Sequence, residues 1–126
     1  MQIEVDFASD KAIYTQLYEG ILLSIAKGEL KVGDALPAVR ALAEEIGINL
    51  HTVNKAYGLL KDDGYVTMDR RKGTIINALP VASNTSQLSA LQNELELLAA
   101  KGHLMGLSED DFINQCKNYF TQFKGV

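Results

Sequence analysis

Short hydrogen-bonding side chains gather between positions 49 and 55, where they could contact the edges of nucleic-acid bases. An asparagine can pair with two edge atoms of adenine, and an apolar or methyl-bearing side chain can contact the methyl group of thymine. The opposing interpretation is that the segment forms only the solvated face of an amphipathic helix. The candidate DNA-contacting residues of this segment are Asn49, Leu50, His51, Thr52, Asn54 and Lys55.

A second group of candidates is basic. Arg70, Arg71 and Lys72 stand in a row before Gly73, between two β-rich runs. Their mutual repulsion serves no structural need, whereas contacts with phosphates in or beside the minor groove would explain it. A solubilising hairpin tip is the alternative. Further upstream, Arg40 could reach a phosphate or a guanine, although taken alone it is simply a surface arginine.

The spacing of apolar residues predicts the elements that position these groups. It predicts helices over 12–27, 38–46 and 50–63 and strands over 65–68 and 74–77. This order is typical of a winged helix-turn-helix, which places its second motif helix in the major groove of DNA. The predicted fold is α+β, mainly α, with an N-terminal winged helix-turn-helix followed by a two-helix C-terminal dimerisation tail.

Capping and turn residues mark the ends of these elements. Pro37 suits the first turn of the second helix, Gly47 ends that helix, and Asn49 can cap the third. On the third helix, we expect Val53 to face the core and Leu50 to point away from it, toward DNA.

Residues 1–78 are predicted to form the DNA-binding domain, 79–85 a linker and 86–126 a helical dimerisation region. Each fully buried Leu or Phe contributes roughly 1.5–3 kcal/mol, and two helices cannot bury both of their apolar stripes against each other alone. A symmetric partner would cover them; folding of the tail onto its own winged helix is the alternative. The candidate dimerisation residues are Leu88, Leu91, Leu95, Leu98, Phe112, Ile113, Phe120 and Phe123.

Composition narrows the class of protein. The chain has 126 residues, 47% of them hydrophobic, and a net charge of −4, which argues mildly against a nucleic-acid partner unless the cations are gathered on one surface. One cysteine and two histidines predict no disulfide, no metal site and no cofactor, and they suit a reducing cytoplasm. No run approaches the ~20 apolar residues of a membrane span. No paired-carboxylate or phosphate-loop motif appears, so we expect no enzyme.

The stretch from Ile13 to Thr74 resembles the GntR family of bacterial transcription regulators. Its marks are the block GELKVGDALPAVRALAEEIGI and the continuation TVNKAYGLL…GY. The resemblance implies an N-terminal winged helix and a variable C-terminal part that dimerises and often binds an effector. The DNA contacts that it implies are those of Arg40, His51, Thr52 and Asn54 and of the wing near Lys72 and Gly73.

This chain also departs from the family pattern. The family often has serine at the position of Ala38, a basic residue at Leu50, arginine at Asn54 and glycine at Arg71. These differences lie on the expected DNA-reading surface. The operator sequence therefore cannot be carried over from relatives.

The short tail is similar to that of the YtrA-type branch of the family, whose members are typically small homodimers with genes that often accompany ABC transporter genes. We therefore expect a cytoplasmic, sequence-specific homodimer, whose two recognition helices require a pseudopalindromic operator. We expect it to be a repressor, because small regulators most simply act by occluding DNA. Its expected partners are double-stranded operator DNA, a second copy and an unidentified small-molecule effector, with no membrane partner. The alternative is a winged-helix protein-interaction module without direct DNA readout, in which the polar helix face meets protein.

Overall fold

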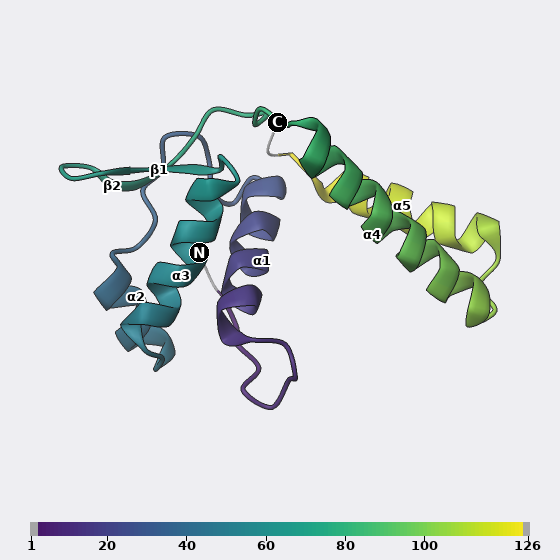
Figure 1. Cartoon of the computed structure of the whole chain (residues 1–126), viewed down its shortest axis with the longest axis horizontal. Coiled ribbons are helices and arrows are strands. Elements are labelled where there is room, and N and C mark those ends of the chain that lie inside the picture. Colours follow the sequence, from purple (N-terminus) through teal and green to yellow (C-terminus); the bar gives the residue numbers. More distant parts are fainter. Residues whose placement is uncertain (1–2, 125–126) are drawn as a thin grey trace. The chain divides into compact units, whose positions relative to one another are not determined.

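Three helices and a β-hairpin form the first of two units in the computed structural model, which describes residues 3–124 (Figure 1). This unit comprises the described residues up to Val81 together with Lys124, and the second unit comprises Ala82–Phe123. The elements of the first unit are α1 (Ile13–Ala26), α2 (Val39–Ile46), α3 (Leu50–Asp62), β1 (Val66–Asp69) and β2 (Gly73–Ile76).

The core of the first unit lies between α1, α2, α3 and the hairpin. Leu17 and Ile21 of α1 are fully buried, because a spacing of four residues places both on one helix face. Val53 and Tyr57 repeat this spacing on α3 and are equally buried. The inward face of α3 is therefore taken up by packing, and only its outward face is available for recognition.

The turn between α2 and α3 is short because two residues give it the required geometry. Gly47 has φ +82°, a left-handed conformation that disfavours any residue with a Cβ. Its amide donates to the Ala43 carbonyl at 2.9 Å, which ends α2. Asn49 Oδ1 then accepts from the His51 amide at 2.8 Å, which confirms Asn49 as the N-cap of α3.

The hairpin is tied to the segment that precedes α2. β1 pairs antiparallel with β2, and Ala35 forms an isolated bridge with Ile75 of β2. The Leu36 amide donates to the Thr74 carbonyl at 2.7 Å, and the Gly33 amide donates to the Ile76 carbonyl at 2.9 Å. Residues 33–36 thus extend the two-stranded sheet on the β2 side and hold the hairpin in place.

The predicted winged helix-turn-helix is confirmed, with local corrections. β1 begins and ends one residue later than predicted, and β2 begins and ends one residue earlier. The register places Asp69 opposite Gly73, so both residues belong to the strands. Pro37 lies before the helix rather than in its first turn, since Ala38 is the N-cap of α2. The backbone of Lys124 lies with the first unit, where its amide donates to the Ala26 carbonyl at 2.7 Å, although 86–126 was predicted as one helical region. Residues 125–126 lie outside the described part of the chain.

The hydroxyl of Tyr57 links α3 to the loop before α2. Tyr57 is fully buried, burial raises the pKa of its hydroxyl, and Oη donates to the Pro37 carbonyl at 2.7 Å. We expect Tyr57→Phe to lower the free energy of unfolding by about 1–3 kcal/mol, because the Pro37 carbonyl loses its partner. Urea denaturation measures this change.

Tyr65→Phe is the matched control for this prediction. Tyr65 is half-buried, but its hydroxyl makes no hydrogen bond to another residue of the described range. We expect the free energy of unfolding of this control to stay within about 0.5 kcal/mol of the wild-type value. Equal effects of the two substitutions would contradict the assigned role of the Tyr57 hydroxyl.

Two helices, α4 (Thr85–Leu104) and α5 (Glu109–Gln122), make up the second unit. Each begins with a side-chain cap. Asn84 forms a capping box with Gln87, and Ser108 Oγ accepts from the Asp111 amide at 3.1 Å. Acidic residues lie in the first turn of α5 and basic ones in the last turn of α4, as the helix dipoles favour. The two helices of the second unit therefore have well-defined starts and ends.

Packing inside the second unit is thin. Gly102 is the one buried residue of Ala82–Phe123. A Cβ at this position would lie 3.2 Å from Phe112 Cδ2 and 3.5 Å from Leu107 Cδ1, so the missing side chain lets the start of α5 approach α4 closely. The rest of the apolar surface of both helices stays largely open to solvent.

Candidate nucleic-acid interface

The outward face of α3 begins with exposed polar side chains. His51 and Asn54 are exposed and Thr52 is half-buried, and none of the three makes a side-chain hydrogen bond to another residue of the described range. Their donors and acceptors are therefore available to a partner. Asn49 differs, because its side chain already caps the helix.

Leu50 does not point away from the core as predicted. It is half-buried and packs against the hydrophobic core of the first unit. Leu50 is the first residue of α3, and Ile48, in the turn before the helix, is also partly buried and packs against the core. Leu50 is therefore positioned mainly for packing.

Lys55 has a partner that the sequence analysis missed. Its Nζ lies 3.9 Å from the centre of the Tyr14 ring on α1, in a cation–π contact. A contact of this kind is worth roughly 0.5–1 kcal/mol at an exposed site. The predicted phosphate contact of Lys55 stays a prediction, and Tyr14 holds the ammonium group that would make it.

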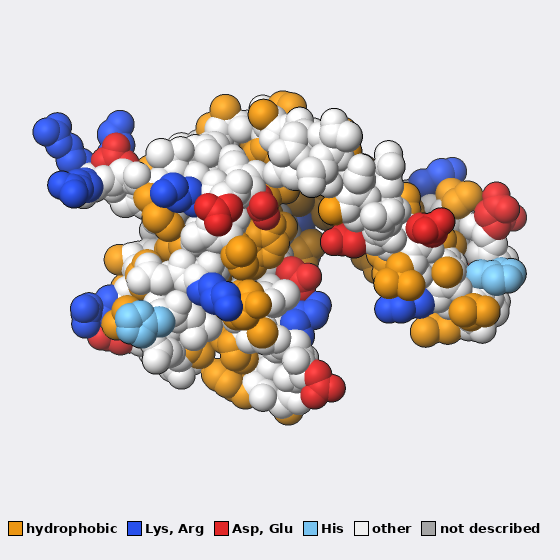
Figure 2. Space-filling view, in the orientation of Figure 1, with side chains coloured by type: hydrophobic (Ala, Val, Ile, Leu, Met, Phe, Trp, Pro, Cys, Tyr) orange, Lys and Arg blue, Asp and Glu red, His pale blue; other side chains and the backbone are white. Residues whose placement is uncertain are grey.

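The wing, which is the β1–β2 hairpin, presents a group of free cations at its tip. Arg70, Arg71 and Lys72 are exposed, and their side chains form no ion pair or hydrogen bond within residues 3–124. Figure 2 shows Lys and Arg side chains gathered at the tip of the β1–β2 hairpin. Cations that the protein itself does not neutralise remain available to phosphates.

Asp69 orders the backbone of this tip. Its Oδ1 accepts from the Arg71 amide at 2.7 Å and from the Lys72 amide at 3.0 Å, and these two bonds hold the pKa of the carboxyl below its usual value. Asp69 belongs to the segment Asp69–Gly73 that the sequence predicts as the hairpin turn, but it was not among the predicted site residues.

Arg40 lies in the first turn of α2 and is exposed. Like the wing cations, Arg40 forms no ion pair with another described residue. The one salt bridge within residues 3–124 joins Lys11 Nζ and Glu19 Oε1 at 2.7 Å. The structure thus leaves Arg40, the start of α3 and the wing with unsatisfied polar and charged groups. These groups suit contacts with a polyanion.

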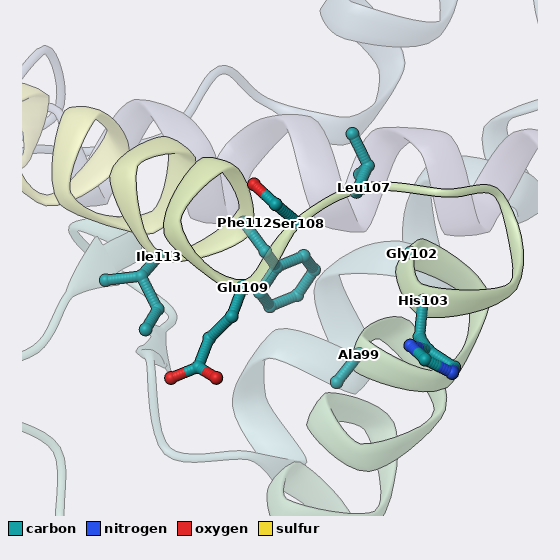
Figure 3. Close-up of a pocket in the computed structure, with 8 residues that line it drawn as sticks. All are labelled: Ala99, Gly102, His103, Leu107, Ser108, Glu109, Phe112 and Ile113. Atoms are coloured by element: carbon teal, nitrogen blue, oxygen red, sulfur yellow. The ribbon is translucent and has the colours of Figure 1, made fainter.

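The second unit contains a small hollow where α4 turns into α5. The ring of Phe112 lies between the two helices there, and His103 and Glu109 also line the hollow (Figure 3). Its volume of about 200 Å³ lies below the roughly 300–1,000 Å³ of typical ligand pockets. Within residues 3–124, no group of three or more His, Cys, Asp or Glu side chains could hold a metal ion, and no helix is long and apolar enough to cross a membrane.

Comparison with known proteins identifies the family. The family model described as "Bacterial regulatory proteins, gntR family" matches residues 13–76, from the start of α1 to the end of β2. The chain belongs to the GntR family. Among its GntR relatives, the HTH-type transcriptional repressor YtrA of Bacillus subtilis is 30% identical over 124 residues, which cover 98% of this chain and 95% of the relative.

Two solved structures of similar proteins extend this assignment. YtrA from Sulfolobus acidocaldarius, a GntR-family transcription factor, is 32% identical with a TM-score of 0.59, covering 95% of this chain and 97% of that one. The DNA-binding domain of AraR in complex with operator ORX1 is 26% identical with a TM-score of 0.52, covering 60% of this chain and 98% of that one. This GntR protein is a DNA-binding transcriptional regulator and not an enzyme.

Proposed function

We propose that this regulator is a homodimeric repressor that binds a pseudopalindromic operator. The observation that carries the proposal is the near absence of buried residues in Ala82–Phe123, where Gly102 alone is buried. The leucines of the α4 stripe are about half exposed, and Phe120 of α5 is 75% exposed. A second copy offering the same surface would remove these side chains from water.

Within each protomer, we assign the described residues up to Val81 to DNA binding and Ala82–Phe123 to dimerisation. His51, Thr52 and Asn54 are proposed to meet base edges in the major groove. Arg40, Lys55 and the three wing cations are proposed to meet phosphates or the minor groove. A symmetric dimer would then place its two α3 helices about one turn of DNA apart, ~34 Å.

Repression is the proposed mode of action, and it is supported by the repressor name of the Bacillus subtilis relative. The regulator would act in the cytoplasm by covering its operator. Transporter genes are the proposed targets, on the resemblance to the YtrA-type branch. An unidentified small-molecule effector is the proposed signal, with release of the operator as the expected response.

The test is a selection of bound fragments from a genomic DNA pool of the source organism at moderate salt, followed by sequencing. An Arg40→Ala/Arg71→Ala variant, which removes one cation from α2 and one from the wing, serves as control. We expect enrichment of an inverted repeat by the wild-type protein and its loss in the variant. Enrichment of single half-sites would contradict the dimer. Absence of any enrichment would favour the protein-interaction module.

A further inference from the structure

The tip of the wing has the geometry of a tight three-residue loop. Asp69 pairs with Gly73 in the β1–β2 register, so residues 70–72 form the whole connection. Gly73 has φ +83°, the left-handed conformation that commonly follows a type I turn in such loops. Aspartate is favoured at the first position of a type I turn because its carboxylate accepts backbone N–H groups.

One oxygen atom organises two of the three basic residues in this loop. Asp69 Oδ1 accepts from the amides of both Arg71 and Lys72, whereas the side chains of those two residues make no hydrogen bond to the described part of the protein. Their backbones are therefore restrained while their charged groups stay free. A negative charge next to three cations would otherwise oppose DNA binding, because it repels phosphates.

We propose that Asp69 is a positioning residue for DNA binding, whose carboxylate holds the backbone of Arg71 and Lys72 so that the wing meets DNA already ordered. The inference rests on the proposed DNA contacts of the wing. Ordering the loop before binding removes part of the conformational entropy that would otherwise be lost on binding. Asp69 thus has two opposite effects, a favourable one through its hydrogen bonds and an unfavourable one through its charge.

Two substitutions at this position separate these effects. Asp69→Asn removes the charge but keeps an oxygen that accepts the same two N–H bonds, whereas Asp69→Ala removes the charge and the bonds together. Affinity would be measured against the operator duplex recovered by the selection and against a scrambled duplex of the same composition. Asp62→Asn and Asp62→Ala serve as matched controls, because Asp62 is exposed at the end of α3 and makes no side-chain hydrogen bond within the described range.

We expect Asp69→Asn to bind both duplexes at least as tightly as the wild-type protein. Asp69→Ala should bind about five- to thirtyfold more weakly than Asp69→Asn, which corresponds to the cost of ordering the backbone of one residue. It should also show a shallower dependence of affinity on salt, because fewer phosphates are engaged. The two Asp62 variants should bind alike. Hydrogen exchange of the Arg71 and Lys72 amides in the free protein should accelerate in Asp69→Ala but not in Asp69→Asn.

Equal affinity and equal salt dependence of the two Asp69 variants, with normal binding by the wild-type protein, would overturn this inference and leave the proposed function intact. A lowered thermal midpoint of Asp69→Ala without a change in salt dependence would reduce Asp69 to a turn-forming residue and overturn the inference too. Failure of the wild-type protein to bind either duplex would overturn the proposed function, and the positioning role with it.

Discussion

Replacement of Arg70, Arg71 and Lys72 by alanine is expected to weaken DNA binding by about 10³-fold at low salt. The three side chains are exposed and form no hydrogen bond or ion pair within the described residues, so we expect the substitution to leave the fold intact. Charge-assisted hydrogen bonds contribute about 1.5 kcal/mol each at the low end, and three of them together correspond to about 10³-fold. Fluorescence anisotropy with the selected operator measures this loss.

The salt dependence of binding provides a second readout of the same variant. Each lost phosphate contact should lower the slope of log affinity against log salt by about 0.9, so the slope should fall by up to about three. A variant with Lys27, Lys31 and Lys61 replaced by alanine is the matched control, since it removes the same charge from exposed positions of the first unit away from the wing. Equal losses in the two variants would show that overall charge, and not the wing, drives binding.

Replacement of Leu88 and Leu95 by aspartate is expected to convert the proposed dimer into monomers. The two leucines lie seven residues apart on one face of α4 and are 48% and 53% exposed, so the substitutions create no buried charge within a single protomer. In the dimer, the same carboxylates would be buried in an apolar interface, at a cost of several kcal/mol. Analytical ultracentrifugation at micromolar concentration should show a monomer.

Loss of the dimer should carry a large loss of operator affinity. Two linked half-site contacts gain about 10²–10⁴-fold over one through effective concentration, and a monomer loses this gain. Ser86→Asp/Asn93→Asp is the matched control, with the same charge and the same spacing of seven residues on the opposite face of α4. A dimer that survives Leu88→Asp/Leu95→Asp would refute the assignment of the α4 stripe to dimerisation.

Local signals in the sequence predicted most of the DNA-binding unit. Gly47, Asn49 and Gly73 each encode one backbone geometry, and the structure places each in that geometry. The regular spacing of apolar residues likewise predicted that Val53 faces the core, and Val53 is fully buried. Such signals can be read from the sequence because each depends on the conformation or hydrogen bonds of residues only a few positions apart.

Tertiary packing explains what the sequence did not reveal. Leu50 starts a helix, and which way the first residue of a helix turns depends on the neighbouring loop and core rather than on periodicity. The contact of Lys55 with Tyr14 joins residues of two different helices, so no local pattern contains it. The candidate site residues were chosen from their type and position, and their DNA contacts stay a prediction. The structure separates Leu50, which packs against the core, from His51 and Asn54, which are exposed.

The division of α3 into a packed face and a free face has a consequence for how operator preference can diverge. Val53 and Tyr57 support the fold from one side of the helix, while His51 and Asn54 on the other side make no side-chain hydrogen bond to the described residues. Surface substitutions of this kind usually change stability by less than about 0.5 kcal/mol. Given the proposed base contacts of His51 and Asn54, a duplicated gene could therefore acquire a new target sequence through a few changes at these positions, without first accumulating compensating mutations in the core.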